Sequence, residues 1–328
     1  MEDIKGTVCV TGGTGYVASW LIMRLLQHGY SVRATIRSKP SEGKRDISYL
    51  TNLPGAQERL QIFHADLNHP ETFNDAIQGC TGVFHLAHPM DVKGKEPEET
   101  VTKRAVEGAL GILKACLNCK TVKRVVYTSS LATILYNSKG LEETDENTWS
   151  EVDVCRSNKL VSSSYSVSKS LVERTALEFA ETNGLDLVTV VLPIVFGPFV
   201  GPNVPASVYI GLAPIFGDQE QCKFLISTYM VHIDDVASAH IFLLEHPNAK
   251  GRYICSSIQT TIHELYDFLS ARYPHLQISI PDHLMEIKGY KGTNVSSIKL
   301  LNTGFKFKCG LSEMFDGAIQ CCKEKGFL

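Results

Sequence analysis

The chain has 328 residues, of which 44% are hydrophobic and 20% are charged. This balance is typical of a folded globular protein and excludes a disordered chain, a collagen and a coiled coil. Its 32 basic and 35 acidic residues leave a net charge of −3, so neither nucleic acid nor an anionic membrane is an expected partner.

No apolar run reaches the ~18 residues of a membrane-spanning helix. A strand-like run begins at Thr7, with no basic region and apolar tract before it. We therefore expect a cytoplasmic protein whose ten cysteines are reduced thiols. Cys116 and Cys119 form a C-x-x-C pair, but no second pair completes a zinc site, so packing thiols are the better interpretation.

Short β-branched runs alternate with helical patterns over the first 195 residues. An apolar stripe after Trp20 predicts a helix that ends at Gly29, and a longer helical run extends from Glu98 to Cys119. The predicted strands are Thr7–Thr11, Ser31–Arg37, Leu60–Ala65, Gly82–Ala87, Val122–Ser129 and Asp186–Leu192. This alternation predicts an α/β fold of Rossmann type, with a doubly wound parallel sheet covered on both faces.

A glycine-rich turn joins the first predicted strand to the first predicted helix. Residues Thr11 to Ala18 read T-G-G-T-G-Y-V-A. The glycines allow the backbone to approach a diphosphate closely, and the helix N-terminus presents unpaired N–H groups to that anion. A glycine pattern alone is weak evidence. Its place between a strand and a helix, at the first crossover, favours a dinucleotide site over a plain glycine turn.

The residues after the second predicted strand bear on the choice of dinucleotide. An NAD-selective site usually has an acidic residue here that accepts a hydrogen bond from the ribose 2′-hydroxyl, whereas this chain has Arg37, Lys39, Lys44 and Arg45. Cations suit the 2′-phosphate of NADP(H), while NAD(H) and a plain basic loop stay as alternatives. Asp66 could accept a hydrogen bond from the adenine amino group or cap the segment that follows.

Tyr165 and Lys169 lie four residues apart at the start of a predicted helix, so both side chains project from one face. To exchange a proton near neutral pH, a phenol must have its pKa lowered by about three units, or ~4 kcal/mol. We expect the Lys169 ammonium to supply part of that lowering. Ser129 and Ser130 end the fifth predicted strand, where a hydroxyl can donate a hydrogen bond to a substrate oxygen.

The regular alternation stops at the turn-rich segment Gly197–Pro205. We predict a dinucleotide-binding domain over residues 1–195. Residues 196–328 are predicted to form a smaller, interleaved substrate-binding lobe, with segments such as Gly251–Cys255 returning to the large sheet. Asp234 and Asp235, with His232 and His240 nearby, could suggest a metal site. We interpret these aspartates as helix caps and expect no metal.

Taken together, these motifs resemble the extended short-chain dehydrogenase/reductase family, and more narrowly its plant group of dihydroflavonol reductase-like and vestitone reductase-like enzymes. The T-G-x-x-G-x-x loop, the strand-end serine and Y-x-x-x-K carry the resemblance, as do the strings V-H-I-D-D-V and C-K-E-K-G-F-L. It covers the whole chain and is closest to vestitone reductase and noscapine synthase.

The resemblance implies that Tyr165 donates a proton, that Lys169 supports it and that Ser130 orients a carbonyl. The cofactor contacts that it implies are Gly12, Thr14, Gly15, Tyr16, Val17, Arg37, Lys44, Asp66, Leu67, Leu86, Ala87, His88, Thr128, Pro193, Val195 and Ser207. The candidate substrate contacts are His88, Met90, Leu135 and Tyr229.

Departures from the family patterns narrow the expected substrate. The stretch from Ser163 to Lys169 lacks the N-W-Y-C-Y-G-K motif of cinnamoyl-CoA reductases, which disfavours a CoA thioester. Leu135 and Tyr229 stand where dihydroflavonol reductases have Asn and Gln that read substrate hydroxyls, which disfavours a dihydroflavonol.

We therefore expect NADPH-dependent reduction of a ketone on an aromatic polycyclic plant metabolite, such as a vestitone-like isoflavanone or related flavonoid. The alternative is NAD(P)+-dependent oxidation of a cyclic hemiacetal or alcohol in alkaloid metabolism, as in noscapine synthase. A third hypothesis is a cofactor-binding regulatory protein without catalysis. We expect a monomer or a weak homo-oligomer.

Overall fold

The computed structural model describes residues 5–37, 46–89, 96–157, 163–287 and 292–328. Its larger sheet has seven strands, and all neighbouring pairs are parallel. In spatial order they are β10 (Gly251–Ile254), β7 (Leu187–Leu192), β5 (Arg124–Ser130), β4 (Gly82–His85), β1 (Thr7–Thr11), β2 (Ser31–Ile36) and β3 (Leu60–His64). The strand order reverses between β1 and β4, where sheets of this kind bind ligands. The predicted Rossmann-type fold is confirmed.

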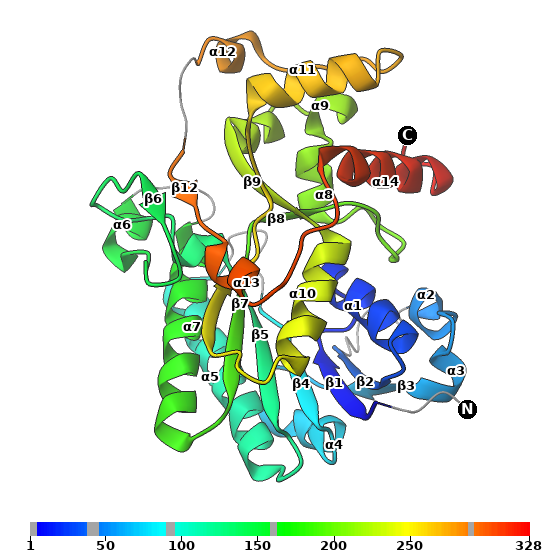
Figure 1. Ribbon diagram of the computed structural model, residues 1–328, viewed down its shortest axis with the longest axis vertical. Coiled ribbons are helices and arrows are strands. Elements are labelled where there is room, and N and C mark those ends of the chain that lie inside the picture. The colour runs from blue at the N-terminus through cyan, green and yellow to red at the C-terminus, as the bar shows by residue number, and fades with distance from the viewer. Residues whose placement is uncertain (1–4, 38–45, 90–95, 158–162, 288–291) are drawn as a thin grey trace.

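Helices cover both faces of this sheet (Figure 1). One face carries α5 (Glu98–Asn118) and α7 (Ser163–Asn183), and the other carries α1 (Tyr16–Gln27) and α10 (Ile233–Glu245). Successive strand residues therefore enter different cores: Val126 packs on the α1 and α10 side, whereas Val125 and Tyr127 pack on the α5 and α7 side. Burial on both faces explains why β7 is apolar at nearly every position.

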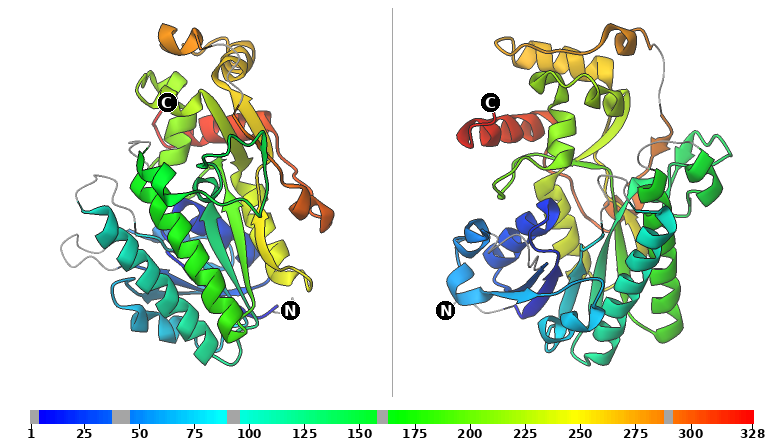
Figure 2. Two further views of the ribbon diagram at one scale, coloured as in Figure 1. Left: turned by 90° about the vertical axis from the view of Figure 1, so that its left-hand side faces the viewer. Right: turned by 180° about the vertical axis from the view of Figure 1, so that it is seen from behind.

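A second, smaller lobe lies beyond one end of the large sheet (Figure 2). Its three-stranded sheet has the order β11 (Ile258–Thr261), β9 (Ser227–His232) and β8 (Ile194–Phe196). The lobe's longer helices are α8 (Ala206–Gly211), α11 (Ile262–Arg272) and α14 (Leu311–Glu324). A separate hydrophobic core joins them, and Phe196, Met230 and Phe315 are among its fully buried members.

The remaining elements are short. They are α2 (Ser48–Thr51), α3 (Ala56–Arg59), η1 (Pro70–Phe73), α4 (Asn74–Ile77), η2 (Leu131–Thr133), β6 (Glu143–Thr144), α6 (Val152–Ser157), α9 (Ala213–Phe216), η3 (Gln221–Leu225), α12 (Asp282–Met285), β12 (Asn294–Val295) and α13 (Ile298–Asn302). None of the described helices is long and apolar enough to cross a membrane.

Two elements that follow residue 196 pack with the large lobe: one is a strand of its sheet and the other is a helix that covers that sheet. β10 pairs in parallel with β7, and α10 packs beside α1. The two lobes are thus interleaved along the chain, and the division at residue 195 stays a prediction.

The start of α10 differs from the expectation. Its N-cap is His232, whose Nδ1 accepts a hydrogen bond from the Asp234 backbone N–H at 3.1 Å. Asp235 instead accepts hydrogen bonds from the N–H groups of Lys308 at 3.0 Å and Cys309 at 3.1 Å. The prediction that the aspartates cap the helix was wrong for Asp235, because this carboxylate fixes the C-terminal segment to α10. Within the described ranges, no group of three or more His, Cys, Asp or Glu side chains could hold a metal ion.

Candidate active site

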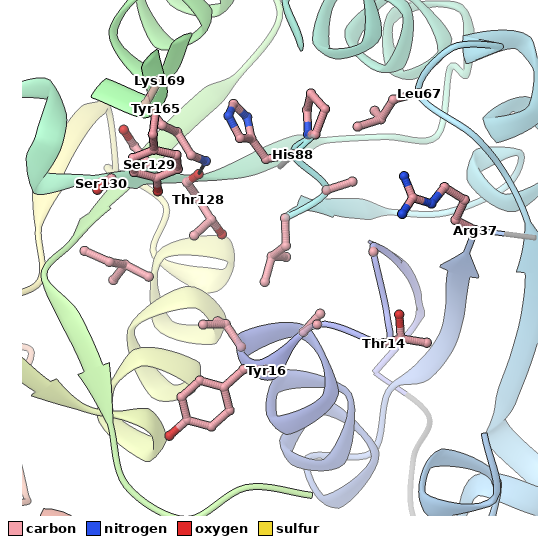
Figure 3. Close-up of a pocket in the computed structure, with 18 of the residues that line it drawn as sticks. Thr14, Tyr16, Arg37, Leu67, His88, Thr128, Ser129, Ser130, Tyr165 and Lys169 are labelled. Carbon is pink, nitrogen blue, oxygen red and sulfur yellow. Dashed lines mark hydrogen bonds between the residues drawn. The ribbon is translucent and has the colours of Figure 1, made fainter. Parts of the chain in front are cut away.

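An open cavity of about 790 Å³ lies across the carboxyl ends of the central strands. It brings together every described residue that was predicted for catalysis or cofactor contact: Gly12, Thr14, Gly15, Tyr16, Val17, Arg37, Asp66, Leu67, Leu86, Ala87, His88, Thr128, Ser130, Tyr165, Lys169, Pro193, Val195 and Ser207. Figure 3 shows Ser130, Tyr165 and Lys169 together at one end of the cavity and Arg37 at the other. The predicted contacts Lys44 and Met90 lie outside the described residues.

The glycine loop forms the floor between these two ends. Gly12 has a φ of +71°, and a Cβ at this position would lie 3.2 Å from the Ala87 Cα, so only glycine fits without strain. Gly15 is the N-cap of α1 and has no side chain to occupy the helix end, and no acidic residue stands in the first turn of α1. The N-terminal N–H groups of α1 are therefore free to bind an anion.

A threonine at the end of β1 fixes the opposite wall. The Thr11 hydroxyl oxygen accepts hydrogen bonds from the N–H groups of Leu86 and Ala87, both at 3.0 Å. It also lies 3.0 Å from His85 Nδ1. Burial lowers the pKa of His85 to about 3, so this ring is neutral and its Nδ1 can accept the hydroxyl proton. Thr11 thus holds the backbone that faces Gly12.

Arg37 follows β2 and its exposed side chain lines the cavity near Thr14 (Figure 3). Replacing Arg37 by glutamine is expected to raise the KM for NADPH by about tenfold to a hundredfold, because the predicted charge-assisted contact between Arg37 and the 2′-phosphate would be lost. The KM for NADH should stay within about threefold, since NADH lacks that phosphate. Steady-state kinetics with both cofactors measure this change.

The matched control for Arg37 is Lys123→Gln, which removes an exposed cation at the opposite end of the sheet, just before β5. It should leave both KM values unchanged. An equal rise for NADPH and NADH in the Arg37→Gln variant would contradict a contact to the 2′-phosphate.

Tyr165, Lys169 and Ser130 meet where α7 begins and β5 ends. Ser130 lies beside Tyr165 in the cavity lining, and its hydroxyl oxygen accepts a hydrogen bond from the Ala132 N–H at 3.2 Å. Lys169 Nζ donates a hydrogen bond to the carbonyl oxygen of Thr128 at 3.0 Å. The ammonium and both hydroxyls therefore face the same part of the cavity.

Burial is the largest influence on the pKa values of Tyr165 and Lys169. It raises the pKa of Tyr165, and the adjacent Ser130 hydroxyl offsets this only in part. Burial also lowers the pKa of Lys169 to about 8, against the attraction of Glu173. The expected lowering of the Tyr165 pKa by Lys169 is not found: burial raises the pKa of the phenol, and the Lys169 ammonium donates to the Thr128 carbonyl instead. In this structure the phenol is protonated at neutral pH.

His88 stands beside the phenol. Its ring lies edge-on to that of Tyr165, with centroids 5.8 Å apart and an interplanar angle of 87°. Burial keeps the pKa of His88 well below its usual range, so the ring is neutral. Its Nε2 is buried and has no hydrogen-bond partner among the described residues. These features agree with a role in substrate contact, which stays a prediction.

The structure does not bring the other two candidate substrate residues to this cavity. Tyr229 lies on β9, and its hydroxyl donates a hydrogen bond to the Thr293 carbonyl. Leu135 follows η2 and packs against the hydrophobic cluster that contains Tyr229, Leu131 and Ile254. Both side chains are engaged in packing between the two lobes, and their predicted contact with substrate has no support from the cavity lining.

Sequence patterns did not reveal the groups behind the site. Thr128 Oγ1 lies 2.8 Å from His240 Nε2, and His240 Nδ1 lies 2.8 Å from the Val236 carbonyl oxygen. Because a carbonyl can only accept, Nδ1 carries the ring proton and Nε2 accepts from the Thr128 hydroxyl. Burial lowers the pKa of His240 to about 4, which keeps this ring neutral. In the sequence, the position of His240 on the inner face of the helix is the feature that could have indicated this contact with Thr128.

A sheet of this topology, with a loop shaped to receive a diphosphate, defines a dinucleotide-binding Rossmann protein. The model of the NAD dependent epimerase/dehydratase family matches residues 8–255. The chain belongs to this family.

Individual relatives match over nearly the whole chain. Protein BRI1-5 ENHANCED 1 from Arabidopsis thaliana is 57% identical, over 99% of this chain and 91% of that protein. Vestitone reductase from Medicago sativa is 52% identical over the full length of both. The crystal structure of vestitone reductase from alfalfa covers 99% of this chain and 100% of its own, with a TM-score of 0.89. Noscapine synthase SDR1 from Papaver somniferum is 49% identical, over 100% of this chain and 95% of that protein.

These similarities confirm the predicted resemblance to the extended short-chain dehydrogenase/reductase family and its vestitone reductase-like plant group. They also confirm the predicted oxidoreductase class.

Proposed function

We propose that this protein reduces a ketone on an aromatic polycyclic metabolite, with NADPH as the hydride donor and Ser130, Tyr165 and Lys169 as the catalytic group. The observation that carries the proposal is the meeting of these three side chains in one cavity with the glycine loop. The full-length similarity to vestitone reductase supports a flavonoid-type ketone as substrate.

The residues present fit NADP(H). The open N-terminus of α1 and the close-packed Gly12 suit the diphosphate, and Arg37 suits the 2′-phosphate. Asp66 lies on the same wall, and its carboxylate accepts hydrogen bonds from the backbone and side-chain nitrogens of Asn68, both at 2.9 Å. When bound, NADPH supplies a hydride to the carbonyl carbon.

Residues of the chain then stabilise the substrate oxygen and supply its proton. The Ser130 hydroxyl, whose oxygen already accepts from Ala132, has a proton to donate to the substrate oxygen. Tyr165 transfers its proton to that oxygen as negative charge develops there. The raised pKa of Tyr165 suits this role, because reduction requires a protonated phenol at the start. Lys169 places a positive charge behind the phenolate that remains.

The alternative function is oxidation of a cyclic hemiacetal or alcohol at the same site. The similarity to noscapine synthase favours it. In that direction Tyr165 must begin as a phenolate, and its burial in the present structure opposes this. Reduction is therefore the better-supported direction.

An assay of both directions tests the proposal. The purified protein should oxidise NADPH in the presence of a vestitone-type isoflavanone. Absorbance at the NADPH band measures the rate. Faster oxidation of a cyclic hemiacetal with NAD+ would favour the alternative. Tight NADPH binding without turnover of any aromatic ketone or alcohol would favour the regulatory hypothesis.

A further inference from the structure

A buried carboxylate lies directly behind the proposed catalytic group. Tyr165, Lys169 and Glu173 follow one another at intervals of four residues on α7, so their side chains lie on one face of the helix in successive turns. Glu173 is 0% exposed and Lys169 is 5% exposed. A carboxylate this deeply buried needs compensating partners.

The Glu173 carboxylate has a full set of donors. It accepts hydrogen bonds from the hydroxyls of Ser129 at 2.7 Å and Thr189 at 2.5 Å. It also accepts two from the Arg252 guanidinium, at 3.1 Å from Nε and 3.2 Å from Nη2. The three partners lie on β5, β7 and β10, so one side chain on α7 holds three neighbouring strands of the sheet.

The contact with Ser129 reaches the catalytic group through the backbone. Ser129 lies between Thr128, whose carbonyl binds the Lys169 ammonium, and Ser130, which lies beside Tyr165 in the cavity lining. Alternate side chains of β5 point to opposite faces of the sheet. His240 therefore holds Thr128 from the α10 side, while Glu173 holds Ser129 from the α7 side. The end of β5 is fixed from both faces.

Glu173 also provides the negative charge near Lys169. The titratable groups that face the Lys169 ammonium are Tyr165 and Glu173 on α7, Tyr127 on β5, His85 on β4, and His88 just beyond β4. Both histidines are neutral because burial lowers their pKa values, and burial raises the pKa of Tyr127 well above its ordinary value. Within the described part of the chain, Glu173 is the acidic member of this set.

We propose that Glu173 is a positioning residue for the proposed reaction: its carboxylate fixes the end of β5 through Ser129 and places a negative charge one helical turn from Lys169. This inference rests on the proposed function of Tyr165 and Lys169. Arg252 completes the unit, because its guanidinium neutralises Glu173 and makes the burial of the carboxylate tolerable.

The Glu173→Gln variant tests the proposal. The amide keeps the shape and an oxygen that can accept from Ser129, but it removes the charge. Without that charge, the titration midpoint of Lys169 should fall by about one pH unit or more. The ¹³Cε chemical shift of Lys169, assigned by its loss in the Lys169→Met variant, measures the midpoint without any substrate. A purely structural role would change thermal stability and leave this midpoint in place.

Kinetics provide the second measurement. The alkaline limb of kcat/KM for NADPH should move to lower pH in Glu173→Gln by the same amount as the midpoint of Lys169. Glu178→Gln, an exposed charge change on the same helix, should move neither value. An inactive wild-type protein would refute the proposed function, and the ¹³Cε titration would still decide the role of Glu173.

The single variant could unfold because it leaves the buried Arg252 without its carboxylate. The double variant Glu173→Gln/Arg252→Gln removes both charges, an exchange that buried ion pairs often tolerate. The Lys169 midpoint should again fall, because Glu173 is the charge that acts on Lys169 directly. A midpoint that matches the wild type in the folded single or double variant overturns the proposal.

Discussion

Replacing Tyr165 by phenylalanine is expected to lower kcat for ketone reduction by about a thousandfold, the scale of a lost general acid. The phenol lies beside Ser130 in the cavity, and its raised pKa keeps it protonated at neutral pH. Phenylalanine fills nearly the same volume, so the packing against His88 should persist. NADPH binding, followed by cofactor fluorescence, should change by less than about threefold, because the proposed contacts to the diphosphate and the 2′-phosphate lie at the glycine loop and at Arg37.

The control for this variant is Tyr209→Phe. Tyr209 is 38% exposed on α8, and its hydroxyl donates a hydrogen bond to Asp218 at 3.0 Å, so this change also removes one phenol hydroxyl. It should retain full activity. A Tyr165→Phe variant with more than about a tenth of the wild-type kcat would show that another group delivers the proton, and the catalytic assignment would have to be withdrawn.

The activity of the wild-type protein should fall on the alkaline side of about pH 8. Burial lowers the pKa of Lys169 to about 8, so the ammonium is present below this pH and is lost above it. If the ammonium is required, kcat/KM for NADPH should decrease about tenfold for each further pH unit. Lys169→Met should lower kcat by about a hundredfold at pH 7 and should abolish this alkaline limb.

Rate measurements between pH 6 and 10 test this dependence, with Lys103→Met as the matched control. The Lys103 side chain is 76% exposed on α5 and lies 3.9 Å from Glu107, outside the cavity lining. Its loss should leave the whole profile unchanged. An alkaline limb that survives in Lys169→Met would have to be assigned to another group.

Local sequence patterns were sufficient to predict the fold and the residues that line the cavity at the glycine loop and at the start of α7. The six strands predicted from β-branched runs were found within two residues of their expected ends. Central strands such as β7 are buried on both faces and have nearly continuous apolar runs, whereas the edge strand β3 is only partly buried. The glycine loop and the Tyr165 and Lys169 pair could be identified for a related reason. In each motif the residues are close in sequence, and the chemistry depends on their spacing along a single turn or helix.

What the sequence did not predict depends on contacts between distant residues. Arg252 and Glu173 are 79 positions apart, and no local pattern marks them as a pair. The sequence analysis expected a lowered pKa for Tyr165, whereas the structure raises it. The expectation considered the nearby ammonium and not the burial of the phenol. Leu135 and Tyr229 were assigned from a family pattern, which does not reveal that both side chains pack in one hydrophobic cluster; their contact with substrate stays a prediction.

The return of β10 and α10 to the large sheet limits how this protein can be recombined with its relatives. A chimera joined at residue 195 would pair β7 of one parent with β10 of another, and would place a foreign α10 against α1 and beneath Thr128. An exchange of substrate preference should therefore graft the segments on either side of residues 233–254 and leave that stretch with the parent that supplies the cofactor domain. The segment that must come from one parent is therefore discontinuous along the chain: it combines residues 1–195 with residues 233–254.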